Sequence, residues 1–236
     1  GYAICDIEHL GVKTALATRM LKPAFALVDP LTTHGLPQAV VAASGMDVVM
    51  HACESLTARP FYARPLGPAG APRPLNQGSN PWSDIGCRET LRIAGRYFAR
   101  ALEDASDIEA REAMMWAATL AGTALNNAGT ALPHGCSYPV SGGVKHGGAK
   151  KHYAPGSGYA NRAGGSSAPL LPHGYAVAVM APAAFAATAA GSPERHLEAA
   201  ALLGAAMMLV RDGAPAMHAR GRTRARAHAR ARVHTS

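Results

Sequence analysis

The sequence predicts a mainly helical fold with short strands only at its N-terminal end. Three observations support this: long Ala-rich stretches with helical spacing of apolar residues, Pro- and Gly-containing segments that separate them, and strand-like runs confined to residues 2–29. Hydrophobic residues make up 48% of the 236 residues, which is enough to bury a core.

The N-terminal region contains two runs typical of β-strands, at 2–5 and 24–28, and Asp29-Pro30 ends the second. The first residue is Gly rather than Met, and it opens directly onto an apolar run. We therefore expect the chain to be a piece of a longer protein, with residues 1–36 as the remnant of another domain.

A helical domain is predicted over residues 37–212. Its expected helices span 37–56, 83–104, 107–126, 172–190 and 193–210, with Ser83 and Ser192 as N-caps and Pro193 in the first turn of the last helix. The segment 129–142 carries a Leu-Pro-His-Gly sequence between two of these helices.

Two stretches lack a periodic apolar face, and we expect both to be poorly ordered. The first is a Gly-rich insert at 143–168, and the second is an Arg-rich tail at 213–236. Residues 211–236 hold seven Arg and one Asp, so they supply +6 of the net charge of +8. The basic character therefore belongs to the tail and not to the fold.

The four cysteines are widely spaced and form no CxxC pair. This spacing argues against a structural zinc cluster and against a disulfide-rich scaffold. No run of 18 or more apolar residues and no signal-peptide pattern occurs, so we expect no membrane partner.

The residues that carry chemistry are one carboxylate and three histidines. Asp47 and His51 are four residues apart in a helical pattern and share one helix face, although a simple hydrogen-bonded Asp–His pair has the same spacing. His134 and His173 each stand between Pro and Gly, where a buried structural histidine is the alternative. Together the four suit Fe²⁺ or Zn²⁺ with a position open to substrate.

The order of these motifs resembles the ligand pattern of iron-containing alcohol dehydrogenases. The pattern reads Gly45-Met46-Asp47-x-x-x-His51, then Gly129-x-x-x-Pro133-His134-Gly135, then Pro172-His173-Gly174. Further segments resemble the hydroxyacid-oxoacid transhydrogenase branch, among them Gln77-Gly78-Ser79-Asn80-Pro81, Asn126-Asn127-Ala128-Gly129, Ser137-Tyr138-Pro139 and the run from Pro193 to Glu198. The resemblance covers about residues 1–210 without the insert.

This resemblance implies the helical metal-binding domain of a dehydroquinate synthase-like fold, with residues 1–36 left from an α/β domain that binds NAD. It implies Asp47, His51, His134 and His173 as metal ligands and Lys13 as a residue near the nicotinamide, although a solvated surface lysine is the alternative for Lys13. Tyr138 stands where many members carry a histidine implicated in proton transfer. No Gly-rich dinucleotide-binding turn occurs in this chain.

The implied reaction is hydride transfer from a hydroxyacid such as 4-hydroxybutyrate, through bound NAD, to an oxoacid such as 2-oxoglutarate, with the metal as a Lewis acid. The resemblance also implies a mitochondrial location, with the cytoplasm as the alternative, and allows a homo-oligomer. Candidates for the substrate carboxylate are loop residues that could equally be solvated: Arg64, Arg73, Asn76 and Asn80.

Three other functions stay open at this point. The chain could serve a general iron-type NAD(P)-dependent alcohol dehydrogenase, or it could be an inactive fragment. An Arg-rich tail can also bind nucleic acid through phosphates, but no aromatic residue interleaves with these arginines, so we expect no nucleic-acid partner.

Overall fold

The computed structural model describes residues 1–7, 12–65, 67–71, 73–143 and 171–204. All of them belong to one compact unit, Gly1–Gly204. Residues 144–168 of the expected insert and the expected tail at 213–236 lie outside the described residues, so the expectation that they are poorly ordered stays a prediction.

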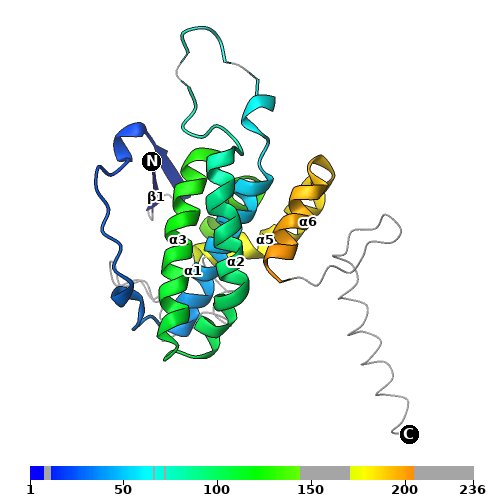
Figure 1. Cartoon of the computed structure of the whole chain (residues 1–236). Helices are drawn as coiled ribbons and strands as arrows, with labels where there is room; N and C mark the ends of the chain where they lie inside the picture. Colours follow the sequence, from blue (N-terminus) through cyan, green and yellow to red (C-terminus); the bar gives the residue numbers. More distant parts are fainter. Residues whose placement is uncertain (8–11, 66, 72, 144–170, 205–236) are drawn as a thin grey trace, which may run out of the picture. The chain divides into compact units, whose positions relative to one another are not determined.

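Three long helices form the centre of this unit. They are α1 (Gln38–Thr57), α2 (Pro81–Glu103) and α3 (Ile108–Ala128), and each packs on the other two (Figure 1). Small and medium side chains fill the space between them, including the fully buried Leu56, Leu91 and Ala117. The prediction of a mainly helical fold is confirmed, and the Ala-rich composition explains why the helices pack so closely.

The start of α2 differs from the prediction, because Asn80 and not Ser83 is the N-cap. The Asn80 side chain accepts a hydrogen bond from the Ser83 backbone N–H, and the Ser83 hydroxyl accepts one from the Asn80 N–H. Pro81 occupies the first helical position, where it needs no hydrogen-bond partner for its nitrogen. Ser83 is thus the reciprocal member of a capping box three residues inside the helix.

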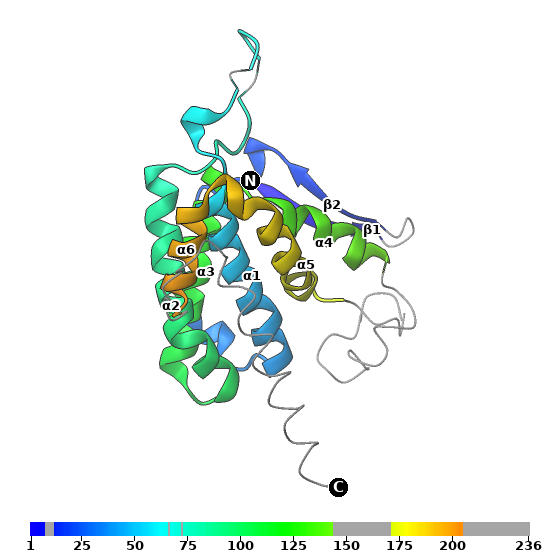
Figure 2. The ribbon, with the colours of Figure 1, turned by 90° about the vertical axis from the view of Figure 1, so that its right-hand side faces the viewer.

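Two shorter helices, α4 (Leu132–Gly143) and α5 (His173–Thr188), pack on each other (Figure 2). Helix α5 also packs along α1, and α4 lies against strand β2 (Val12–Ala17). This arrangement brings the first turns of α4 and α5 to α1.

The last described helix, α6 (Pro193–Leu202), is shorter than the predicted 193–210. The backbone N–H groups of Leu203 and Gly204 bond back to Ala199 and Ala201, and Gly204 has a positive φ of 81°. Glycine in this conformation ends helices commonly. Ser192 is at the N-cap as predicted, but its side chain makes no capping hydrogen bond.

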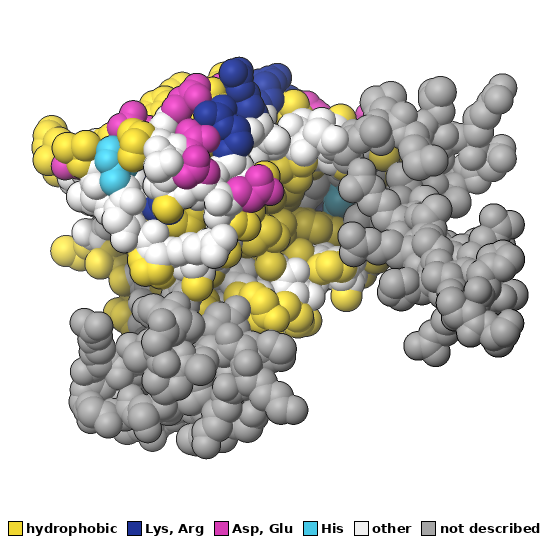
Figure 3. Space-filling view, turned by 90° about the horizontal axis from the view of Figure 1, so that it is seen from below, with side chains coloured by type: hydrophobic (Ala, Val, Ile, Leu, Met, Phe, Trp, Pro, Cys, Tyr) yellow, Lys and Arg dark blue, Asp and Glu magenta, His cyan; other side chains and the backbone are white. Residues whose placement is uncertain are grey.

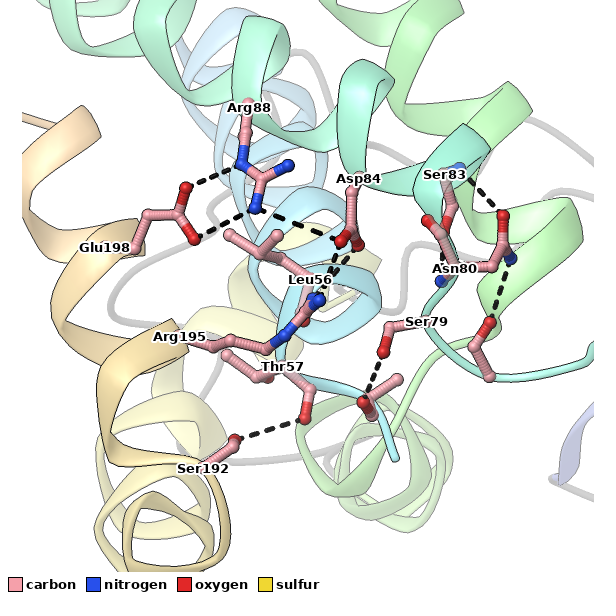
Figure 4. Close-up of polar contacts among 12 residues, drawn as sticks. Leu56, Thr57, Ser79, Asn80, Ser83, Asp84, Arg88, Ser192, Arg195 and Glu198 are labelled. Carbon is pink, nitrogen blue, oxygen red and sulfur yellow. Dashed lines mark hydrogen bonds and ion pairs between the residues drawn. The ribbon is translucent and has the colours of Figure 1, made fainter. Parts of the chain in front are cut away.

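A network of charged side chains fixes α6 to the ends of α1 and α2 (Figure 4). Arg195 donates to both carboxylate oxygens of Asp84, at 3.0 and 2.7 Å, and to the backbone oxygen of Leu56 at 2.6 Å. Arg88 of α2 pairs with Glu198 of α6 at 2.6 Å. Asp84 is only 5% exposed, so the pair with Arg195 offsets the cost of burying its carboxylate.

The N-terminal residues form a two-stranded antiparallel hairpin, β1 (Tyr2–Ile7) with β2, in which Tyr2 faces Ala17. The prediction of a strand at 24–28 is wrong. Phe25 and Leu27 are more than 80% exposed, and no strand pairs with them in the described parts of the chain. Apolar alternation favours a strand only where a neighbouring strand completes its hydrogen bonds.

Short 3-10 turns connect the main elements: Arg19–Leu21, Pro30–Thr33, Phe61–Ala63 and Ala189–Gly191.

Seen from below the view of Figure 1, charged side chains gather toward one edge, and hydrophobic side chains cover much of the remaining described surface (Figure 3).

Two helical stretches, Gln38–Thr57 and His173–Gly191, are long and apolar enough to cross a membrane by length and composition. In the first, 61% of the apolar window is buried inside the protein, because α1 is the central helix of the bundle. In the second, the buried share is 28%. The apolar character of α1 is therefore explained by the core.

Candidate metal centre

The site is built on one face of α1, where three polar residues follow each other at intervals of four and three positions: Asp47, His51 and Glu54. This spacing places the three side chains on the same stripe of the helix. Asp47 and His51 each keep 22% of their side-chain surface exposed, whereas Glu54 is fully buried.

Two further histidines come from the first turns of other helices, His134 from α4 and His173 from α5. Asp47 Oδ1 lies 3.6 Å from His51 Nε2, 3.3 Å from His134 Nε2 and 3.8 Å from His173 Nε2. Ligand atoms about 2.1 Å from a tetrahedral cation would lie about 3.4 Å from each other. The structure thus brings the Nε2 atoms of all three predicted histidines to within 3.3–3.8 Å of one oxygen of Asp47, and separations of this size suit ligands of a shared cation.

The imidazole rings also lie close to each other. The ring centroids of His51 and His134 are 4.7 Å apart and stacked, and those of His134 and His173 are 5.2 Å apart at an angle of 69°. Ligand atoms of Asp47, His51 and His134 all lie within 4.8 Å of one another.

Two buried polar atoms at this point lack a hydrogen-bond partner, Asp47 Oδ1 and His134 Nε2. They are 3.3 Å apart, close to the separation expected of two ligands of one cation. Buried polar atoms are normally satisfied, and a bound ion is one way to satisfy them. The residues present therefore fit a divalent cation.

The protonation states of the site are set by burial and by the two carboxylates. Burial lowers the pKa of His51 to about 4 in spite of the nearby Asp47, so this imidazole is neutral at pH 7. For His134, burial acts in the same direction, but the interactions of its ring with the neighbouring carboxylates of Asp47 and Glu54 outweigh burial and raise the pKa to about 9. The pKa of Asp47 is lowered, because burial is outweighed by the three histidines.

The two Pro-His-Gly segments differ in why glycine follows the histidine. A Cβ on Gly174 would lie 1.9 Å from the backbone oxygen of Ala43 and 2.9 Å from Asp47 Cβ. A Cβ on Gly135 would meet nothing within 4 Å. A close backbone approach thus explains the glycine at position 174, where α5 touches α1, whereas no described atom of the protein comes close to Gly135.

Comparison with known proteins identifies the group to which this architecture belongs. Residues 75–163 match the C-terminal region of the Fe-containing alcohol dehydrogenase family. The chain is also 46% identical over 206 residues, 87% of its length, to the mitochondrial hydroxyacid-oxoacid transhydrogenase of Bos taurus. The chain carries the C-terminal region of the iron-containing alcohol dehydrogenase family. The recognition of this family from the sequence is confirmed.

Further relatives agree with this membership. The transhydrogenase of Homo sapiens is 45% identical over 206 residues. A 1,3-propanediol oxidoreductase is similar in structure with a TM-score of 0.63 and 25% identity, covering 86% of this chain and 42% of that one. An iron-containing alcohol dehydrogenase of Thermotoga maritima has the same fold, with a TM-score of 0.63, 22% identity and coverage of 86% and 44%.

The chain spans 42% of the length of the two transhydrogenases. The aligned part includes the helices that carry the four clustered residues. Family membership therefore describes the helical half of the fold, and the activity of the whole relatives belongs to the proposal below.

The remaining predicted site residues have different positions in this family member. The Tyr138 ring of α4 stacks on the His173 ring with centroids 5.8 Å apart, and burial followed by Asp47 and Glu54 raises the pKa of Tyr138. Tyr138 thus borders the cluster and stays protonated at neutral pH. Lys13 belongs to β2, and its side chain lies outside the described residues.

One residue of the site escaped the sequence interpretation. Glu54 Oε1 lies 2.6 Å from His134 Nδ1, and Glu54 Oε2 accepts a hydrogen bond from the Ala131 backbone N–H. The signal was present, because Glu54 continues the stripe of Asp47 and His51 by one more helical turn.

Three of the four loop residues expected near a substrate carboxylate, Arg64, Asn76 and Asn80, have side-chain partners within the protein. Asn80 caps α2, and Arg64 donates to the backbone and side-chain oxygens of Asn76 at 3.0 and 3.3 Å. Asn76 in turn donates to the Tyr2 hydroxyl at 3.1 Å. These contacts are structural, and a role of the loop in substrate binding stays a prediction.

Proposed function

We propose that Asp47, His51, His134 and His173 hold one divalent cation, Fe²⁺ or Zn²⁺, and that the chain supplies this centre to a hydroxyacid-oxoacid transhydrogenase. The supporting observation is the approach of three histidine Nε2 atoms to within 3.3–3.8 Å of a single Asp47 oxygen. One carboxylate and three imidazoles suit either cation. The family to which the chain belongs favours Fe²⁺.

The proposed reaction moves a hydride from a hydroxyacid of the 4-hydroxybutyrate type, through bound NAD, to an oxoacid of the 2-oxoglutarate type. When bound, the cation supplies Lewis-acid polarisation of a substrate oxygen, and NAD supplies the hydride acceptor. The relatives named as transhydrogenases support this reaction and a mitochondrial location. Because the chain spans 42% of their length, NAD binding is proposed for the fold together with the part that the relatives add.

The side chains of this chain would bind the cation, donate a hydrogen bond to the substrate and lie beside the nicotinamide. Asp47 is the anionic ligand and offsets positive charge, while the neutral His51 contributes a lone pair without adding charge. Tyr138 keeps its proton at neutral pH and can donate a hydrogen bond to a substrate oxygen beside His173. We propose that Lys13 lies near the nicotinamide.

Metal content tests the centre itself. We expect the purified chain to bind one Co²⁺ or Fe²⁺, and Asp47→Ala to weaken binding more than loss of one histidine, because the only anionic ligand is removed. Glu112→Ala is the control, since it removes the carboxylate of another pair, Glu112 with His34 at 3.2 Å. Equal metal occupancy in Asp47→Ala and Glu112→Ala would contradict the proposed ligands.

The reaction class is tested on a protein of the full length of the relatives. A transhydrogenase converts hydroxyacid and oxoacid together without added NAD, whereas a general iron-type alcohol dehydrogenase needs free NAD(P) in stoichiometric amount. Turnover that depends on added NAD(P) would favour the second function, and binding of metal without either activity would favour a structural role.

A further inference from the structure

Glu54 is a charged residue in the interior of the protein, with an exposed fraction of 0%. It lies on α1 three residues after His51, and its carboxylate points to the beginning of α4. A carboxylate in such a place is strongly unfavourable unless its oxygens are hydrogen-bonded. The contacts of these two oxygens therefore indicate what Glu54 does.

Both oxygens face nitrogen atoms of the same short segment. Oε2 accepts from the backbone N–H of Ala131, and Oε1 lies 2.6 Å from Nδ1 of His134. We assign the proton of the second contact to Nδ1 of His134, because an ionised glutamate offers only acceptors. With Nδ1 holding its proton against Glu54, Nε2 is the ring nitrogen that would lose its proton to a binding cation and offer its lone pair.

The same contact fixes where that lone pair points. His134 Nε2 lies 3.3 Å from Asp47 Oδ1, on the far side of the ring from Glu54. The Ala131 bond holds the start of α4, so Glu54 sets both the position of the segment and the rotation of the ring. A carboxylate behind a histidine ligand orients the ring and increases its basicity.

We propose that Glu54 is a positioning residue for the metal centre, which keeps His134 in the Nδ1–H form and directs its Nε2 at the cation. This inference rests on the proposed function, since it assumes that His134 is a ligand. Glu54 also brings a second negative charge to the site, so that Asp47 and Glu54 together would balance a divalent cation that displaces the second proton of His134.

Glu54→Gln tests this role with almost no change of volume. The amide has one acceptor and one donor group, so it cannot accept from both Ala131 N–H and His134 Nδ1–H. We expect the dissociation constant for Co²⁺, measured from its visible absorption in the folded chain, to rise by about 10- to 100-fold.

Ser55→Ala is the matched control. Ser55 is the next residue of α1, is also 0% exposed, and donates to the backbone oxygen of Gly129 at 3.0 Å. We expect this variant to lose stability without a change in Co²⁺ affinity. A Co²⁺ affinity in Glu54→Gln within threefold of the wild-type value, or an equal loss in both variants, would overturn the positioning role.

A second measurement needs no variant and covers the case in which Glu54→Gln does not fold. In the Zn²⁺-loaded wild-type chain, ¹⁵N NMR should show His134 protonated on Nδ1, with a slowly exchanging proton, and Zn²⁺ on Nε2. Zn²⁺ on Nδ1 would refute the inference while leaving the metal site intact. Absence of Co²⁺ and Zn²⁺ binding by the wild-type chain would instead overturn the proposed function and this inference with it.

Discussion

The contact between α5 and α1 at Gly174 gives the sharpest test of how the centre is assembled. In Gly174→Ala the new Cβ would start 1.9 Å from the Ala43 carbonyl oxygen, a backbone atom that cannot rotate away. Side-chain carbons keep about 3 Å or more from such an atom, so α5 must move by about 1 Å. His173 is the preceding residue and moves with it.

The size of this displacement decides the expected effect. Metal-ligand distances tolerate changes of about 0.2 Å, so a shift of about 1 Å removes His173 from the coordination sphere. We expect overpacking to lower the free energy of unfolding by about 1–3 kcal/mol. We also expect the Co²⁺ dissociation constant of the folded variant to rise by about 10-fold or more.

Gly135→Ala provides the comparison within the same Pro-His-Gly motif. Its Cβ would meet nothing within 4 Å, and alanine favours the helical conformation over glycine by up to about 1 kcal/mol. We expect unchanged Co²⁺ affinity and equal or higher stability, measured by urea denaturation. If the two variants weaken Co²⁺ binding alike, or if neither does, the argument from close helix contact is refuted.

Three other predictions concern the frame around the centre. Arg195→Ala removes the guanidinium that donates to both oxygens of the buried Asp84 and should lower the free energy of unfolding, measured in urea, by about 2–3 kcal/mol. Glu198→Ala removes the pair with Arg88, whose two side chains are 35% exposed, and should lower it by less than about 1 kcal/mol. Burial raises the pKa of Cys53 and of Cys87 to about 12, so mass spectrometry after iodoacetamide treatment at pH 8 should find both unmodified in the native chain. Because these folded-state values exceed the unfolded value of about 9, stability should fall between pH 9 and 12 by about 1.4 kcal/mol per thiol per pH unit, and Cys53→Ala/Cys87→Ala should flatten that slope. An unchanged slope would contradict the pKa values.

The sequence was most informative where one local pattern determines the result. The period of apolar residues located α1, α2 and α3, and the i, i+4 spacing placed Asp47 and His51 on one face. The Pro-His-Gly segments indicated His134 and His173, and the family resemblance implied that both are ligands. Their approach to Asp47 depends on how three helices pack and has no local signature.

Two of the errors have their physical origin in contacts that are distant in the sequence. The run 24–28 has strand-like composition but no neighbouring strand in the described residues. The role of Glu54 depends on its contact with His134, eighty positions later. The misplaced cap of α2 is a local error, because both Asn80 and Ser83 can cap a helix and the prediction named Ser83 instead of Asn80.

Helix α1 carries Asp47, His51 and Glu54 within three turns, and this constrains the length of the segment more than its composition. Each inserted or deleted residue rotates the rest of a helix by about 100° and shifts it by about 1.5 Å. One such change between His51 and Glu54 would turn the ligand pair and the buried carboxylate to different sides of the helix, whatever the identity of the new residue. A change between Asp47 and His51 would separate the two ligands themselves. In related sequences, the spacing of these three positions, rather than the identity of the residues between them, therefore distinguishes a chain that can assemble the metal centre from one that cannot.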